Sequence, residues 1–294
     1  MAWAQPLTRG IDRRTLLGAL TVPAGLAAAP GRVCAASPGP ILRLAGQARQ
    51  GGTLIGRTLP GAGVSLDGVA LTQASSGGLF VVGLDRDCPA DIVLSVSRDG
   101  QRIDERRVAV APGDFDIQRI DGLPPQQVRP QGEALLARIA AEAERKARGW
   151  ASEVETEDFA GGFTSPLRKF RLSGRFGGQR ILNGEPMTPH FGADLAAPEG
   201  TPILAPAPGR VCFAETGLHF EGGLTMIDHG QGLVTAYLHQ LKVGVRPGQS
   251  VARGQVIGAV GQEGRATGPH LCWRMKWRDR RLDPMLLLGV RAPA

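Results

Sequence analysis

The chain has one tyrosine, and aromatic residues make up only 5% of its 294 positions. Glycine (42) and proline (22) are abundant by contrast. This balance favours short strands joined by many turns over long helices. Long apolar runs are missing as well, because the run over residues 16–29 is too short to span a bilayer. The sequence therefore predicts a mainly β protein, long enough for two domains, with no transmembrane segment in the mature chain.

The N-terminal residues have the pattern of an export signal. Arg13 and Arg14 precede the modest apolar run over residues 16–29, and small residues follow at 35–36. We interpret residues 1–36 as a twin-arginine signal, which places the mature protein in the periplasm or cell envelope. The alternatives are a disordered basic N-terminus or a lipid-anchored cysteine.

The positive charge of the chain is mild once this segment is set aside. Removing four arginines and one aspartate lowers the formal charge from +7 to +4. A basic balance fits an anionic partner such as the cell-wall polymer, although many exported proteins share it. No stripe of lysine and arginine interleaved with aromatic residues is present, which argues against a nucleic-acid partner.

Cysteine is scarce, and three cysteines remain after cleavage: Cys88, Cys212 and Cys272. An odd number in an exported protein argues against a full disulfide framework. A disulfide between Cys212 and Cys272 is one alternative. At least one thiol is then free or bound to something else.

Short apolar runs separated by turn residues fill residues 41–128 and predict a small β-sandwich. Asp67-Gly68 and Asp99-Gly100 are expected as tight turns. No cluster in this domain has catalytic geometry, so its role is spacing or docking. The predicted strands cover residues 53–55, 64–66, 79–82, 92–96 and 107–110.

A linker over residues 129–159 follows, and its proline-rich start cannot continue a sheet. We expect a helix from Glu133 to Trp150, with Glu142–Lys146 and Glu144–Arg148 as favourable pairs four residues apart. Such a helix packs on its own chain more often than on a partner. Its expected apolar stripe is Leu136, Ile139, Ala140, Ala143, Ala147 and Trp150.

All five histidines lie between residues 190 and 270. His190 and Asp194 share a face in an extended segment, as do His270 and Cys272. His239 follows a predicted strand. Buried singly, such polar groups are costly, so their clustering indicates a metal site, and the donor types suit Zn²⁺.

Several motifs in this region form an ordered set. They are Phe176-Gly177, His190-x-x-x-Asp194, Ala197-Pro198-Glu199-Gly200-Thr201-Pro202, Asp228-His229-Gly230, Tyr237-Leu238-His239, Val245-Arg246-Pro247-Gly248-Gln249, Gly258-x-x-Gly261 and Thr267-Gly268-Pro269-His270-Leu271. With them, residues 160–289 resemble the lysostaphin/LytM family of peptidoglycan zinc endopeptidases. The resemblance implies an antiparallel β domain, related to the duplicated hybrid motif, with its site in an open groove.

The resemblance also implies roles for five residues. Zinc is expected on His190, Asp194 and the residue at position 272, with His239 and His270 as the catalytic pair. The family has histidine where this chain has Cys272. A thiolate ligand lowers the local charge, so the bound water should keep a higher pKa and chemistry should be slower. Alternatively, Cys272 is an apolar strand residue at an inactive site, and His239 and His270 are merely hydrogen-bonded.

The sequence thus predicts a zinc-dependent endopeptidase that hydrolyses peptide cross-links of peptidoglycan. The alternative is a catalytically weak or inactive module that binds cell wall and regulates another hydrolase, which gives a cell-wall hydrolase or divisome protein as a possible partner. His219 and His229 are expected to be structural or on the surface. Trp273 and Trp277 either line a groove or pack, and the basic residues 274–281 either contact peptide carboxylates or form a solvated face.

Overall fold

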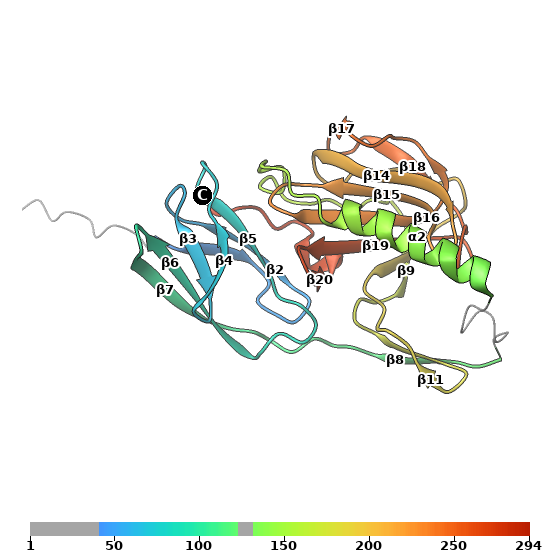
Figure 1. The fold of residues 1–294 in the computed structure, drawn as a ribbon, viewed down its shortest axis with the longest axis horizontal. Helices are drawn as coiled ribbons and strands as arrows, with labels where there is room; N and C mark the ends of the chain where they lie inside the picture. Colours follow the sequence, from blue (N-terminus) through green and yellow to red (C-terminus); the bar gives the residue numbers. More distant parts are fainter. Residues whose placement is uncertain (1–40, 123–131) are drawn as a thin grey trace, which may run out of the picture. The chain divides into compact units, whose positions relative to one another are not determined.

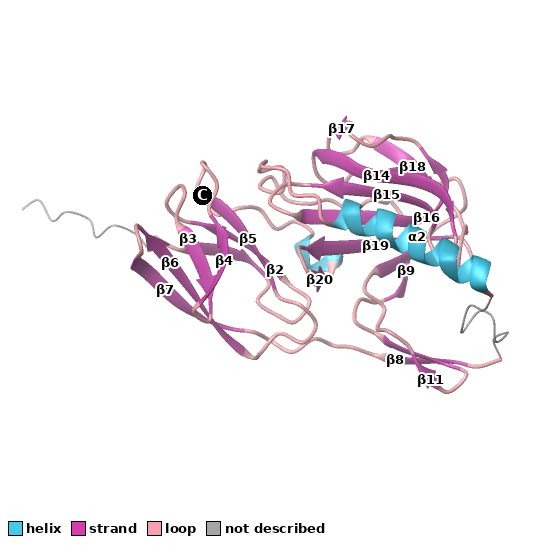
Figure 2. Ribbon diagram, in the orientation of Figure 1, coloured by secondary structure: helices cyan, strands magenta, loops and turns pink. Residues whose placement is uncertain are grey.

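Strands are the main regular secondary structure in the part of the chain that the structure describes. This computed structural model covers residues 41–122 and 132–294 (Figure 1). The predicted export signal and most of the proline-rich segment lie outside these residues. Within them, α2 (Glu133–Trp150) is the single α-helix and the sheets are almost entirely antiparallel (Figure 2). The prediction of a mainly β fold is confirmed. No helix in the described ranges is long and apolar enough to cross a membrane.

Two sheets built from residues 43–109 share one apolar core. Phe80 and Val82 of one sheet and Val64, Leu94 and Val96 of the other belong to the same buried cluster, which is the arrangement of a β-sandwich. The first sheet has the order β1 (Arg43–Gly46), β2 (Thr53–Arg57), β5 (Leu79–Gly83), and the second β4 (Val69–Gln73), β3 (Gly63–Leu66), β6 (Asp91–Arg98), β7 (Gln101–Ala109).

The five strands expected in this region are present, and β1 and β4 are additional. Asp67 (φ 49°) and Gly68 (φ 80°) form the turn between β3 and β4. Asp99 (φ 51°) and Gly100 (φ 76°) form the turn between β6 and β7. Positive φ at both central residues is the geometry that Asp-Gly favours in two-residue hairpins.

A ten-stranded sheet dominates the C-terminal part of the chain. Its main order is β17-β14-β15-β16-β19-β12-β9, with β13, β18 and β20 paired at its side. The bounds are β9 (Arg171–Gly174), β12 (Ala193–Ala196), β13 (Pro202–Leu204), β14 (Gly209–Leu218), β15 (Gly222–Asp228), β16 (Leu233–Val243), β17 (Ser250–Val251), β18 (Val256–Val260), β19 (His270–Trp277) and β20 (Arg280–Leu282), before a short 3-10 helix η1 (Pro284–Leu287).

A small third sheet joins distant parts of the chain. β8 (Ile117–Ile120) pairs in parallel with β10 (Gln179–Leu182), which pairs with β11 (Glu185–Pro186). β8 therefore lies outside the two sandwich sheets, although its residues fall within the range 41–128. The relation to a duplicated hybrid motif stays a prediction.

Helix α2 has the predicted bounds but presents a different face to the sheet. Leu136 is 50% exposed, and Ala140, Ala143 and Ala147 are exposed, so the expected apolar stripe is wrong at these four positions. Ile139 is half-buried, and Trp150 packs against an apolar cluster as expected. The inward face carries Glu142 and Gly149 instead. A Cβ on Gly149 would lie 3.0 Å from Phe213 Cβ and 2.9 Å from Met226 Sδ, so glycine permits the close approach of α2 to β14 and β15.

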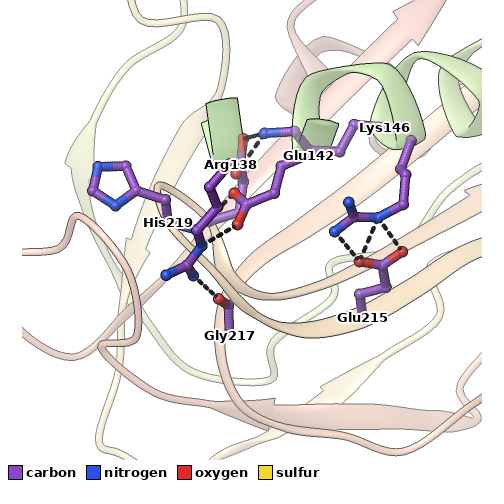
Figure 3. A network of polar contacts seen from close by, with 8 residues as sticks. Arg138, Glu142, Lys146, Glu215, Gly217 and His219 are labelled. Carbon is purple, nitrogen blue, oxygen red and sulfur yellow. Dashed lines mark hydrogen bonds and ion pairs between the residues drawn. The ribbon is translucent and has the colours of Figure 1, made fainter. Parts of the chain in front are cut away.

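Ion pairs hold the inward face of α2 in place (Figure 3). Glu142 accepts hydrogen bonds from Arg138 Nε and the His219 backbone N–H, both at 2.8 Å. Lys146 pairs with Glu221 at 2.7 Å. The expected Glu142–Lys146 pair is therefore wrong, because each side chain has a closer partner. The expected Glu144–Arg148 pair is confirmed, at 3.7 Å on the exposed side.

We expect Glu142→Ala to lower the free energy of unfolding by about 1–3 kcal/mol, since it removes a buried carboxylate and leaves the half-buried His219 N–H without its acceptor. Chemical denaturation followed by circular dichroism measures this. The matched control is Glu144→Ala on the same helix, where the side chain is 80% exposed and surface pairs contribute little. Equal effects of the two substitutions would contradict the assigned role of Glu142.

Candidate metal centre

Three predicted ligand residues converge where β12 and β19 lie side by side. Asp194 of β12 is directly opposite Cys272 of β19, and His190 precedes β12. His190 Nε2 lies 3.1 Å from Asp194 Oδ1 and 3.4 Å from Cys272 Sγ. All three donor atoms lie within 4.8 Å of one another, and all three residues are buried. Their spacing suits donors that share one ion.

Two glycines make room for this cluster. A Cβ on Gly174, which β9 places opposite Asp194, would lie 2.5 Å from Asp194 Oδ2. A Cβ on Gly192 would lie 3.1 Å from Cys272 Sγ. Side chains at either position would therefore displace the candidate ligands.

The donor set fits a cation. His190 Nδ1 lies 3.3 Å from the Arg175 carbonyl oxygen. Because a carbonyl can only accept, this contact requires a proton on Nδ1 and turns Nε2 toward Asp194 and Cys272, so that Nε2 is the atom a metal would bind in exchange for its proton. Asp194 Oδ1 is buried and, apart from His190 Nε2 at 3.1 Å, has no hydrogen-bond partner in the described structure. Imidazole, carboxylate and thiol are also the ligand types that zinc takes.

The pKa shifts of His190 and Asp194 indicate that this cluster favours positive charge. Burial opposes a charge on His190, but the hydrogen bonds to Asp194 and Cys272 outweigh it and raise its pKa to about 9. Burial likewise opposes the Asp194 carboxylate, yet His190 and Arg180 hold the pKa of this carboxyl well below its usual range. A positive charge is therefore stabilised between these donors.

Two arginines that the metal-site prediction did not include flank the cluster. Arg180 Nη2 lies 2.9 Å from Asp194 Oδ2, and Arg274 Nε lies 3.4 Å from Cys272 Sγ. Burial would raise the pKa of the Cys272 thiol, but the charge of Arg274 helps to lower it to about 6. Arg180 comes from β10, 14 residues before Asp194 and outside the ligand motif, so spacing within the motif gives no signal for it.

The two expected catalytic histidines lie together beside the donors. The ring centroids of His239 and His270 are 4.7 Å apart. His239 Nδ1 lies 2.7 Å from Glu263 O, and His270 Nδ1 lies 2.8 Å from Gly268 O. Both carbonyls must accept, so each neutral ring carries its proton on Nδ1 and has an unprotonated Nε2 that can take a proton. His270 Nε2 lies 3.7 Å from Asp194 Oδ1.

His239 has an unusual backbone conformation. β16 pairs with β19 as far as Leu238 and with β18 from Gln240 onward. His239 lies between these two pairings with φ 64°, and its N–H donates to Glu221 O at 2.8 Å. Non-glycine residues seldom adopt this region, and such strain is concentrated at functional sites. The sequence motif gave no indication of it.

The remaining candidates have structural positions. Trp273 and Trp277 are buried in apolar clusters, so they pack rather than line a groove. The described cysteines Cys88, Cys212 and Cys272 are all free, so the alternative of a Cys212–Cys272 disulfide is wrong. His219 is half-buried against the ring of Phe220.

His229 is buried and bonded on both sides, to Pro208 O at 2.5 Å and Thr235 Oγ1 at 2.7 Å. Burial lowers its pKa to about 4. In the unfolded chain His229 therefore binds a proton near pH 6.5, whereas in the folded chain it is protonated only near pH 4. Between these values stability falls as pH falls, by up to about 3 kcal/mol.

We expect His229→Gln to flatten this dependence. Free energies of unfolding measured from pH 7 to pH 4 should converge for the two proteins as pH falls, because only the natural protein loses this contribution. Other titrating groups, such as Asp283, whose pKa burial raises to about 6, are common to both chains and cancel in the difference. Parallel curves would contradict the assignment.

Known proteins match the part of the chain that carries this site. The model described as Peptidase family M23 matches residues 188–284. Peptidoglycan DD-endopeptidase ShyA of Vibrio cholerae is 39% identical over 122 residues, which cover 40% of this chain and 27% of that protein. Cell division protein DipM of Caulobacter vibrioides is 32% identical over 151 residues, covering 47% of this chain and 23% of that protein.

One solved structure matches over a longer range. A crystal structure from Pseudomonas aeruginosa, assigned to peptidase M23, has a TM-score of 0.60 and 29% identity, covering 83% of this chain and 96% of that chain. The likeness thus extends beyond residues 188–284. The curated relatives are longer, since the match spans about a quarter of their length.

Proposed function

We propose that this chain, whose residues 188–284 are a domain of peptidase family M23, is a zinc-dependent endopeptidase that hydrolyses peptide cross-links of peptidoglycan. The observation that carries the proposal is the buried His190–Asp194–Cys272 cluster with the His239–His270 pair beside it. The name of ShyA supports the substrate, and the mildly basic mature chain is compatible with it.

His190 Nε2, Asp194 Oδ1 and Cys272 Sγ would hold the zinc ion. Bound there, zinc supplies a Lewis acid that polarises the scissile carbonyl and activates the attacking water. The Arg175 carbonyl fixes the His190 tautomer. Arg180 and Arg274 stabilise the anionic forms of Asp194 and Cys272, which are the forms that bind metal.

His239 and His270 would manage the protons. Each ring is oriented by its Nδ1–H, and each has an unprotonated Nε2 when neutral. One takes a proton from the attacking water, and the protonated ring then returns it to the leaving amine. The other donates to the oxygen that gains negative charge, provided that it is protonated.

The same proposal includes location and organisation. Arg13 and Arg14 would direct export by the twin-arginine route, so the folded protein would act in the periplasm or cell envelope. Residues 41–128 would serve as a non-catalytic domain, residues 129–159 as a linker, and residues 160–289 as the peptidase. Another cell-wall hydrolase or a divisome protein is a possible partner, and the name of DipM supports the latter.

The test combines zinc content with cleavage of purified sacculi. We expect about one zinc per chain and release of cross-linked muropeptides that a chelator abolishes and added zinc restores. A protein that carries zinc but releases nothing from sacculi would contradict the enzymatic function.

Cys272 favours a second candidate, a module that binds cell wall without cutting it. The thiolate makes the metal site less positive than a histidine would, which weakens activation of water. Sedimentation with sacculi in the absence of muropeptide release would support this module.

A further inference from the structure

A groove of about 660 Å³ opens beside the candidate metal centre, with His190 in its wall. Its lining includes five cationic side chains and, among the described residues, no acidic one. The walls come from the segments around residues 187–191 and 264–267, with Leu135 and Trp150 of α2 nearby. The cations are Arg180, Arg265, Arg274, Lys276 and Arg281.

Side chains alternate between the two faces of β19, so a row of charged residues extends from the metal centre into the groove. Cys272, Arg274 and Lys276 follow at two-residue steps, so they share one face of the strand. The next cations do not continue the row. Arg278 donates to Leu71 O and to Glu153, and Arg280 donates to Gly83 O. The basic segment 274–281 is thus divided between a groove and structural contacts.

Like charges face one another in this groove. Lys276 is directly opposite Arg281 in the β19–β20 ladder, and such pairs destabilise a sheet. Burial and the charge of Arg281 lower the pKa of Lys276. Burial and the charges of Arg274 and Arg180 also lower the pKa of Arg265. The fold therefore tolerates repulsion that an anion would relieve.

Two of these arginines are held in fixed positions by aromatic rings. The Arg281 guanidinium carbon lies 4.4 Å from the Phe191 ring centre, and that of Arg265 lies 4.7 Å from the Phe220 ring centre. Stacking leaves the edge of a guanidinium available for a carboxylate. Two nearby acids are already paired, Asp194 with Arg180 at 2.9 Å and Glu221 with Lys146 at 2.7 Å.

We propose that this groove binds free carboxylates of the peptide substrate next to the bond that is cut, so that the protein selects acidic peptides over neutral ones. This rests on the proposed function. Charges repeated along β19 at about 7 Å, the length of two extended residues, suit a peptide with more than one carboxylate.

The probes are a stem peptide with free carboxylates and the same peptide with its carboxylates amidated. Neither contains a cross-link, so binding is measured without cleavage. Using the full-length zinc-loaded protein and isothermal titration calorimetry, we expect amidation to weaken binding about tenfold or more. Lys276→Gln and Arg281→Gln should each weaken binding of the acidic peptide about two- to fivefold and leave the amidated peptide unaffected.

Lys169→Gln is the matched control, because Lys169 is exposed and outside the groove lining. Melting temperatures should not fall in the groove variants, since each removes a repulsive partner. Equal affinity for the two peptides, or equal effects of Lys276→Gln and Lys169→Gln, would overturn the proposal. Inorganic phosphate binding as tightly as the acidic peptide would overturn the assignment to carboxylates. Failure of the proposed function would show separately, as lack of zinc-dependent cleavage of sacculi.

Discussion

We expect Asp194→Ala to empty the metal site and to abolish hydrolysis of sacculi. The substitution leaves only His190 and Cys272 as protein ligands, and two ligands hold zinc poorly. It also leaves Arg180 without the carboxylate 2.9 Å away, which adds positive charge where a cation must bind. Zinc affinity should fall more than about 100-fold, beyond the 10- to 100-fold typical of supporting residues. Competition with a chromogenic chelator measures the affinity, and mass spectrometry counts the metal.

Cys272→Ala and His190→Ala should behave alike, since each removes one donor of the same cluster. His270→Ala is the contrasting control. Its imidazole is oriented by Gly268 O and is not one of the three clustered donors. Zinc should therefore stay bound while the rate falls about 10²- to 10⁴-fold, the usual contribution of general acid–base catalysis. If Cys272→Ala keeps full zinc and full activity, Cys272 is not a ligand.

Local pattern was enough to predict five of the seven strands of the β-sandwich. Apolar runs bounded by Asp-Gly turns gave the β-sandwich strands, because both signals depend on neighbouring residues. Spacing paired His190 with Asp194 and His270 with Cys272, and the family resemblance alone joined Cys272 to His190 and Asp194. The direct opposition of Asp194 and Cys272 in the β12–β19 ladder explains how they come together.

Contacts between charged residues that are distant in sequence could not be predicted in the same way. Helical spacing favoured Glu142–Lys146, yet Lys146 bonds Glu221, which is 75 positions away. Arg180 is 94 positions from Arg274, and the two line one groove only in the folded chain. Spacing within a helix or motif carries no information about partners of this kind.

The positive φ of His239 could not be predicted from the sequence either, for a related reason. The positive φ arises where β16 changes partner from β19 to β18. Sheet topology determines that change, whereas the alternation of residues 233–238 predicts only a regular strand.

We expect Cys272→His to raise endopeptidase turnover about tenfold, which corresponds to about 1.4 kcal/mol of barrier. Replacing a thiolate by a neutral imidazole leaves the metal one unit more positive, so the water that it activates should lose a proton more readily. Arg274, 3.4 Å from Sγ, already compensates part of the thiolate charge, so we do not expect a larger gain.

Zinc content and melting temperature must accompany the rate, because Cys272 is 1% exposed and imidazole is larger than a thiol. Cys212→Ala is the control for loss of a free thiol outside the donor cluster. A Cys272→His protein that is folded and zinc-loaded but inert would favour the non-catalytic module.

Arg274→Gln completes a double-mutant cycle that tests the charge argument itself. If Arg274 compensates the thiolate, its loss should lower kcat more in the natural protein than in Cys272→His, where no thiolate needs compensation. Loss of a carboxylate contact in the groove would instead raise KM by a similar factor in both backgrounds. Coupling between positions 272 and 274 in kcat therefore isolates the charge at the metal from the binding of substrate. Additive effects on kcat would show that Arg274 does not act through Cys272.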